Sequence, residues 1–281
     1  MGRRIELWVE ERDGTPAVNP TMQGLLDELA ADGADVRVVV PEWEVIGIGI
    51  GTGEPVPDLV MLKSATSLAL SRAFAAERRG VRFLNGAWSS WRAADKAATI
   101  ARLAAGGLPV PATYLNMPSA SASPPPPDHG GEWVSKPVIG VHGRGVSLHE
   151  AFPDTLSTDP LPPAYVVDDG TRLVQRRVGA EEADIKVYVA GGRCFAARKG
   201  FHAESYRSSD VEPMTLPPSW TEVVLAAGAA LGLRCFGVDL REGERVVAVI
   251  DVNPFPGYRG FPDAVAALRG DVDAVLGLDA T

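Results

Sequence analysis

The sequence predicts an α/β protein, and three observations support this fold class. Strand-like and helix-like segments alternate along residues 1–92, which is typical of a small open α/β layer. Several strand-like segments then follow one another between residues 133 and 198, and the last third combines a helix with a hairpin pattern. The 281 residues, 46% of them hydrophobic, correspond to about two domains and can bury sizeable cores.

The expected elements of the first part are short and amphipathic. Apolar or β-branched runs predict strands at residues 5–9, 36–40, 59–62 and 81–84. Apolar residues at helical spacing predict helices at residues 21–30 and 68–78. A further helix is expected over residues 93–103, with Asp95 in its first turn, where the helix dipole favours an acidic side chain.

The second part is expected to be rich in strands. The predicted strands cover residues 133–138, 164–167, 173–178, 184–189 and 193–198. Four prolines at 124–127 cannot donate to a sheet and predict an extended surface loop. A helix over 220–231, a hairpin of residues 236–240 and 246–252, and a closing helix over 261–268 follow.

Composition and charge exclude several classes of protein. The 27 basic and 36 acidic residues leave a net charge of −9, which argues against a partner with a nucleic-acid backbone. No run approaches the ~18 apolar residues of a membrane-spanning helix, and the apolar stretch near the N-terminus is too short for a signal peptide. Two cysteines cannot form a disulfide framework. We therefore expect a cytoplasmic protein with no membrane partner.

The hairpin near the C-terminus carries the sharpest chemical signal. Asp239 lies in its first strand, while Asp251 and Asn253 lie two residues apart in its second and share one face. Oxygen ligands of this kind are what Mg²⁺ prefers, and Asp is rare inside strands. The alternative is a pair of strand-end acids that cap turns.

A buried lysine before a glycine-rich loop is the second signal. Lys136 lies in an apolar strand, and the following loop contains Gly140, His142, Gly143 and Gly145. Glycine backbone allows N–H groups to approach phosphates closely. The alternative is an ordinary hairpin turn with a lysine whose stem is buried and whose ammonium reaches water.

Two further strands combine acidic and basic residues. Alternation places Asp184, Lys186 and Tyr188 on one face of their strand, and Arg198 lies in the strand that follows. A sheet with one solvated face would show the same alternation. The glycine run at 47–53 is rejected as a dinucleotide site because no helix follows it, and Cys194 and Cys235 are expected to be buried bystanders.

Taken in order, these residues resemble the ATP-grasp superfamily over residues 60 to 268. The resemblance rests on the following ordered set: Asp95, Lys96, Lys136 with its glycine-rich loop, Gln175 to Val178, Asp184, Lys186, Arg198, Asp239, Asp251 and Asn253. Residues 95–111 and the ending 251–260 look most like the ribosomal protein S6 glutamate ligase branch. The same ending is also similar to that of inositol trisphosphate kinases of this superfamily.

The resemblance implies an ATP-grasp fold of three lobes: an N-terminal α/β domain over 1–92, a central lobe over 93–172 and a C-terminal lobe over 173–281. ATP would lie between the last two. The implied ATP-binding residues are Lys96, Lys136, Gly140, His142, Gly143, Gly145, Gln175, Arg176, Val178, Glu181, Asp184 and Lys186. Within this set, backbone groups of Gln175, Arg176 and Val178 would read adenine, and Glu181 would bind the ribose. Arg198 would bind the γ-phosphate and stabilise its transfer, and Lys186, the second catalytic candidate, would lie near adenine or the transferred phosphate. Asp239, Asp251 and Asn253 would hold Mg²⁺, expected as two ions.

The resemblance implies an ATP-dependent carboxylate–amine ligase that forms an amide through an acyl phosphate. The alternative is a small-molecule kinase of the inositol phosphate type, suggested by the ending and by Lys63; a third reading is a nucleotide sensor without catalysis. The Arg-x-Asn element of the ligase branch is absent after Arg198, although Arg207 can substitute in part. The substrate is expected to be a small molecule or a peptide. The residues expected around it are the N-terminal loop 10–19, Lys63, Ser64, His202, Arg207 and the turn 257–260, which contains Gly257 and Arg259. The oligomeric state stays open.

Overall fold

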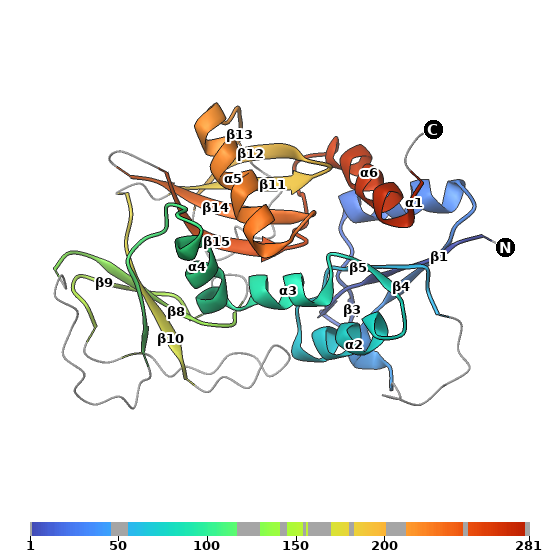
Figure 1. Cartoon of the computed structure of the whole chain (residues 1–281), viewed down its shortest axis with the longest axis horizontal. Coiled ribbons are helices and arrows are strands. Elements are labelled where there is room, and N and C mark those ends of the chain that lie inside the picture. Colours follow the sequence, from blue (N-terminus) through green and yellow to red (C-terminus); the bar gives the residue numbers. More distant parts are fainter. Residues whose placement is uncertain are drawn as a thin grey trace.

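A computed structural model defines the fold and describes residues 2–45, 56–116, 130–140, 145–153, 156, 170–179, 183–200, 212–243 and 247–278. Within these residues the strands form a parallel sheet, two antiparallel sheets and a small hairpin. The parallel sheet lies with the N-terminus, and the two antiparallel sheets lie on the other side of the molecule (Figure 1). The α/β fold class predicted from the sequence is confirmed.

The N-terminal sheet has the order β4-β1-β5-β6, and all its strands are parallel. Its elements are β1 (Arg4–Trp8), β4 (Asp35–Val39), β5 (Leu59–Leu62), β6 (Arg82–Leu84), α1 (Pro20–Ala31) and α2 (Ser67–Glu77). The four strands and two helices expected here agree with these bounds within two residues. The small hairpin of β2 (Glu11–Arg12) and β3 (Thr15–Pro16), and the 3₁₀ turn η1 (Pro41–Trp43), were not expected.

The helix predicted over residues 93–103 is present from residue 96 onward but is interrupted at Asp95. The structure has two helices, α3 (Ala87–Ala94) and α4 (Lys96–Ala105), which meet at Asp95. Asp95 is extended, with φ −88° and ψ 104°, and its side chain accepts a hydrogen bond from the Ala98 N–H as the N-cap of α4. The acid therefore stabilises the start of α4 from outside the helix.

The central sheet has the order β7-β10-β8-β9 and is antiparallel. It consists of β7 (Thr113–Asn116), β8 (Trp133–Pro137), β9 (Ser147–His149) and β10 (Arg172–Arg176). The expected lobe boundary between residues 172 and 173 falls inside β10, whose pairing assigns it to this sheet. The strand expected at 164–167 and the proline loop at 124–127 lie outside the described residues.

The C-terminal sheet has the order β13-β12-β11-β14-β15. Its strands are β11 (Ala183–Ala190), β12 (Arg193–Gly200), β13 (Glu212–Met214), β14 (Phe236–Glu242) and β15 (Val247–Pro254). The helix α5 (Pro218–Leu231) packs on one face, where Val187, Val238 and Val224 belong to one buried cluster. The opposite face is thereby left to the polar residues of these strands.

The last helix joins the C-terminal part of the chain to the N-terminal sheet. The helix α6 runs over Ala264–Leu276, so it begins later and ends later than the expected 261–268. It lies beside α1 (Figure 1), and one buried cluster contains Leu25 of α1, Leu268 of α6 and Tyr258 of the preceding loop. The N-terminal and C-terminal lobes therefore share a hydrophobic core, which fixes their relative position.

Candidate nucleotide and metal site

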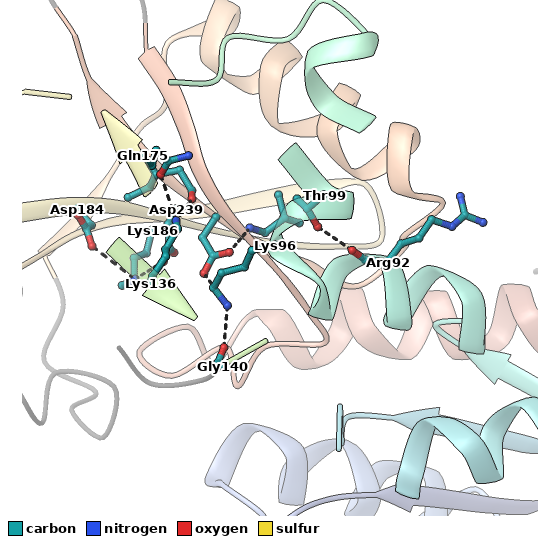
Figure 2. Close-up of polar contacts among 12 residues, drawn as sticks. Arg92, Lys96, Thr99, Lys136, Gly140, Gln175, Asp184, Lys186 and Asp239 are labelled. Atoms are coloured by element: carbon teal, nitrogen blue, oxygen red, sulfur yellow. Dashed lines mark hydrogen bonds and ion pairs between the residues drawn. The ribbon is translucent and has the colours of Figure 1, made fainter. Parts of the chain in front are cut away.

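Three neighbouring strands of the C-terminal sheet bring charged residues into one row. The register places Lys186 of β11 opposite Asp239 of β14, and Asp239 opposite Asp251 of β15. Residues directly opposite one another in an antiparallel pair share a face. The ammonium of Lys186 donates to Asp239 Oδ2 at 2.7 Å and lies 4.0 Å from Asp184 Oδ2 (Figure 2).

The charges in this row shift one another's protonation. Burial raises the pKa of Asp239, and the negative charges of Asp251 and Asp184 raise it further, while Lys186 opposes the shift. Burial alone would lower the pKa of Lys186, but the Asp239 carboxylate raises it above its ordinary value. Asp184 is held in turn by Arg241, whose Nε donates to Asp184 Oδ1 at 2.7 Å.

Lys136 reaches this row from the central sheet. Its ammonium donates to Gln175 Oε1 at 3.1 Å and to the carbonyl of Ile250 at 2.7 Å. Ile250 is the extra residue of a β-bulge, because Asp239 pairs with Asp251 and Leu240 pairs with Val249. Burial lowers the pKa of Lys136, and the Lys96 charge lowers it further against the opposing effect of Asp251.

Lys96 approaches the same row from the start of α4. Its ammonium donates to the Gly140 carbonyl at 2.7 Å and lies 3.9 Å from Asp251 Oδ2. Asp95 and Ile139 form an isolated β-bridge, and the Lys96 N–H donates to the Val138 carbonyl at 3.0 Å. These backbone contacts hold the start of α4 against the segment that leads into the glycine-rich loop. Figure 2 shows Lys96, Lys136 and Gly140 converging from separate elements.

The structure does not bring Arg198 to this row. Its register partner is Ile185, whose side chain is buried on the face covered by α5. Arg198 lies 3.6 Å from Glu242 Oε2, and 36% of its side chain is exposed. The expected contact of Arg198 with the transferred phosphate is therefore not supported by its position, because alternation along β12 assigns it to the other face. The register position opposite Asp184 belongs to Lys199.

The expected adenine-reading segment has a mixed outcome. Gln175 lies at the site, where it accepts from Lys136 and donates to Thr113 Oγ1 at 3.1 Å. The guanidinium of Arg176 stacks over the Trp133 ring at 5.5 Å from its centre, and the Arg176 N–H donates to the Ala112 carbonyl. Val178 follows the end of β10 and is half-buried.

The remaining expected residues are spread over the chain. Gly145 has φ +69°, a conformation that favours glycine, and is exposed. Asn253 lies opposite Gly237 in the sheet, two residues after Asp251. Lys63 directly follows β5 of the N-terminal sheet, and Gly257 and Arg259 lie in the loop after β15, which is tied to Asn19 at the start of α1. His142, Gly143, Glu181 and Arg207 lie outside the described residues.

The sequence did not predict three groups that contact the candidate site residues. Arg241, which binds Asp184, stands two residues after Asp239, so alternation along β14 could have placed it on the same face. Thr113 lies in β7, a strand that was not expected. The Ile250 carbonyl is turned to Lys136 by a bulge, for which the sequence carries no local signal.

The donor set fits Mg²⁺ only in part. Among the residues that the structure describes, no group of three or more His, Cys, Asp or Glu side chains is arranged to hold a metal. Asp239, Asp251 and Asn253 nevertheless supply oxygen ligands from adjacent strands. Mg²⁺ commonly binds through one or two carboxylates and completes its shell with phosphates and water. The residues therefore fit an ion that binds together with a nucleotide.

Comparison with solved structures identifies the fold of the chain. The "Crystal structure of RimK domain protein ATP-grasp from Sphaerobacter thermophilus" matches with a TM-score of 0.71 and 18% identity over 98% of both chains. The ATP-grasp ligase PsnB, solved with a minimal precursor, Mg and ADP, matches with a TM-score of 0.61 and 18% identity over 98% of this chain and 97% of that one. The fold is the ATP-grasp fold, as expected.

The family follows from the sequence match. Residues 93–269 match the RimK-like ATP-grasp domain, so the chain belongs to this family. It is 28% identical over 188 residues to the "Probable alpha-L-glutamate ligase" of Haemophilus influenzae. This match covers 64% of this chain and 61% of that protein. The chain thus spans less than two thirds of that relative. The resemblance to the S6 glutamate ligase branch is confirmed, and the similarity to inositol trisphosphate kinases stays untested.

None of the helices in the described parts of the chain combines the length and apolarity needed to cross a bilayer.

Proposed function

We propose that this protein is an ATP-dependent carboxylate–amine ligase. The observation that carries the proposal is the row of Lys186, Asp239 and Asp251, which Lys96 and Lys136 approach from two other elements. Three cations and two carboxylates around one face suit a magnesium-bound polyphosphate. The chain belongs to the RimK-like ATP-grasp family, and its relatives include proteins named as ligases, which supports a ligase reaction.

The proposed reaction has two steps. An oxygen of the substrate carboxylate attacks the γ-phosphorus of ATP, the bond from that phosphorus to the β–γ bridging oxygen breaks, and ADP leaves. An amine then attacks the carbonyl carbon of the acyl phosphate, inorganic phosphate leaves, and the nitrogen loses a proton to give the amide. Activation as an acyl phosphate splits one difficult condensation into two easier steps.

The side chains of this protein would position the ATP phosphates and neutralise their negative charge. Lys96 and Lys136 would bind the phosphates together with the glycine-rich loop around Gly140 and Gly145. Asp239, Asp251 and Asn253 would hold Mg²⁺, as two ions, which when bound neutralises the phosphate oxygens. Lys186 would orient Asp239, to which it already donates a hydrogen bond. Arg241 would keep Asp184 on the same face.

The remaining assignments concern adenine, ribose and the acceptor. Backbone groups near Gln175 and Val178 would read adenine, and Glu181 would bind the ribose. The partners we propose are a small-molecule or peptide substrate, in keeping with a relative named as a glutamate ligase and a neighbour solved with a peptide precursor. The family uses ATP, and the neighbour solved with Mg and ADP supports the metal.

One experiment separates the ligase from its alternatives. The purified protein is incubated with Mg²⁺, γ-labelled ATP and fractionated metabolites, with and without hydroxylamine. A ligase releases the label as inorganic phosphate and yields a hydroxamate, because hydroxylamine traps the acyl phosphate. Label on a stable small molecule would instead identify a kinase, and no ATP consumption in any fraction would favour a nucleotide sensor.

A further inference from the structure

The carboxyl edge of the N-terminal sheet carries a basic residue that the proposed chemistry leaves without a defined role. Lys63 follows β5 directly, and the N–H groups of Lys63 and Ser64 both donate to the Trp8 carbonyl at the end of β1, at 3.0 and 2.9 Å. The ends of two adjacent parallel strands therefore meet at Lys63. In open α/β sheets, ligands bind outside the carboxyl ends of the strands.

The β2–β3 hairpin brings Arg12 to this edge. Its turn has positive φ at two successive residues, Asp13 at +53° and Gly14 at +76°, which is typical of a tight hairpin turn. The hairpin is closed by a hydrogen bond from the Ala17 N–H to the Glu10 carbonyl at 2.8 Å. Arg12 is thus held on a short, defined element only four residues after the end of β1.

The loop after the metal strand brings Arg259 to the same edge. Phe255 and Tyr258 both have positive φ, at +46° and +51°, which side chains other than glycine rarely adopt. The loop is tied to the start of α1, because Asn19 Nδ2 donates to the Gly257 carbonyl at 2.9 Å. The buried Tyr258 hydroxyl donates to the Val189 carbonyl at 2.6 Å. A strained conformation held by such contacts often marks a functional loop.

The three basic side chains act on one another. Burial lowers the pKa of Lys63, and the positive charges of Arg12 and Arg259 lower it further, while Glu10 opposes them. Burial also lowers the pKa of Arg259, and Arg12 adds to this effect. Like charges gathered in a partly buried place destabilise one another, and an anion bound among them reverses the effect. We call Arg12, Lys63 and Arg259 the basic cluster.

The basic cluster adjoins the site described above through Tyr188. Burial raises the pKa of the Tyr188 hydroxyl and the Asp239 charge raises it further, whereas Lys186 and Arg259 lower it. Tyr188 stands two residues after Lys186 on the same face of β11. The rings of Tyr188 and Tyr258 lie 5.7 Å apart, so the strand that carries Lys186 adjoins the loop that carries Arg259. A substrate group held at the basic cluster would therefore lie beside the carboxylate row.

We propose that the basic cluster is a subsite for an anionic group, a carboxylate or a phosphate, that the substrate carries apart from its reacting atom. The proposal rests on the proposed ligase function and names a class for its substrate. That substrate carries an anionic group in addition to the group that reacts. Arginine is suited to this role because its planar donors match both carboxylate and phosphate.

The test measures anion binding directly, without turnover. Glutarate, inorganic phosphate and the neutral diamide of glutarate are titrated by calorimetry into the full chain saturated with Mg·ADP. We expect at least one anion to bind saturably and the diamide not to bind. The tighter of the two anions identifies whether the subsite prefers a carboxylate or a phosphate. Arg12→Gln and Arg259→Gln should each weaken that binding about tenfold.

Arg79→Gln is the matched control, because Arg79 is an exposed arginine beyond the end of α2 in the same lobe. It should leave anion affinity unchanged, and all three variants should keep the wild-type affinity for Mg·ADP. Anion binding that is absent, or equal in all variants, overturns the subsite. A ligase assay that fails while anion binding follows Arg12 and Arg259 would instead contradict the proposed function and leave the subsite supported.

Discussion

The Lys136 ammonium donates a 2.7 Å hydrogen bond to the Ile250 carbonyl and so joins the central sheet to the C-terminal sheet. This contact exists because the bulge at Ile250 turns one backbone carbonyl away from its own strand pair. The same ammonium donates to Gln175 within the central sheet. Lys136 therefore positions the two sheets between which ATP-grasp proteins are expected to bind nucleotide.

Lys136→Met should weaken Mg·ATP binding by tenfold or more. The variant removes the ammonium that we propose binds phosphate, and it leaves Gln175 and the Ile250 carbonyl without the donor they share. Calorimetry with Mg·ADP and Mg·ATP measures the loss. Arg177→Gln serves as control, because it removes an ion pair between Arg177, directly after β10, and Glu132, directly before β8. Equal nucleotide affinity in both variants would contradict the assignment.

Asp251→Asn should abolish turnover while the fold stays intact. The substitution removes a charged oxygen ligand from the proposed metal site, and we expect a loss of at least about a hundredfold in rate. ATP consumption reports the rate, and thermal unfolding reports the fold. Asp35→Asn, at an exposed position on the first residue of β4, is the control. Full activity of Asp251→Asn would refute the metal assignment.

The sequence predicted the fold more fully than the site. Apolar periodicity located the parallel strands and α5, because burial of one face dictates that pattern. It missed the break at Asp95, where an N-cap interrupts an otherwise continuous helical pattern. It also missed short edge strands such as β9 and β13, whose three residues carry too little pattern to detect.

The site residues were predictable where alternation alone decides their face. Asp184 and Lys186 lie together as expected, because they are two apart on one strand. The resemblance gave Arg198 a role at the phosphate without fixing its face, which depends on how β12 pairs with β11, and a shift of one residue exchanges the two faces. The three residues of the basic cluster lie among those expected around the substrate, since Arg12 falls in the loop 10–19, but the hairpin that carries Arg12 was not expected.

Arg198→Ala should change the rate of turnover by less than about threefold. The side chain lies near Glu242 on the face covered by α5, and a half-exposed ion pair of this kind contributes less than about 1 kcal/mol. Lys186→Ala, on the carboxylate face of the adjacent strand, should be far more damaging. Initial rates of both variants at saturating ATP give the comparison. A greater loss in Arg198→Ala than in Lys186→Ala would show that Arg198 moves to the phosphate during the reaction.

Lys186→Met should raise the pH midpoint of Mg²⁺-dependent nucleotide binding. Burial raises the pKa of Asp239 in the wild type, and Lys186 limits that rise. Without the ammonium, the Asp239 carboxyl keeps its proton to a higher pH, and a protonated carboxyl does not bind the metal. Mg·ADP affinity measured across the acidic range should show a higher midpoint in Lys186→Met than in the wild type. Lys186→Arg retains the charge and should retain the midpoint; identical midpoints in all three proteins would contradict the proposed coupling.

Cys235→Ala should make the protein less sensitive to alkaline unfolding. Burial raises the pKa of the Cys235 thiol well above its ordinary value, the Asp271 charge raises it further, and Sγ donates to Asp271 Oδ2 at 3.2 Å. In the unfolded chain the thiol loses its proton near pH 8.5, so above that pH the folded state binds more protons. The free energy of unfolding of the wild type must therefore fall as pH rises, by up to about 1.4 kcal/mol per pH unit from this group. Denaturant unfolding between pH 8 and 10 should show a shallower fall in Cys235→Ala, and Cys194→Ala, at a half-buried thiol, should change the slope less. Parallel slopes for the wild type and Cys235→Ala would mean that the buried thiol does not govern the alkaline limit of this fold.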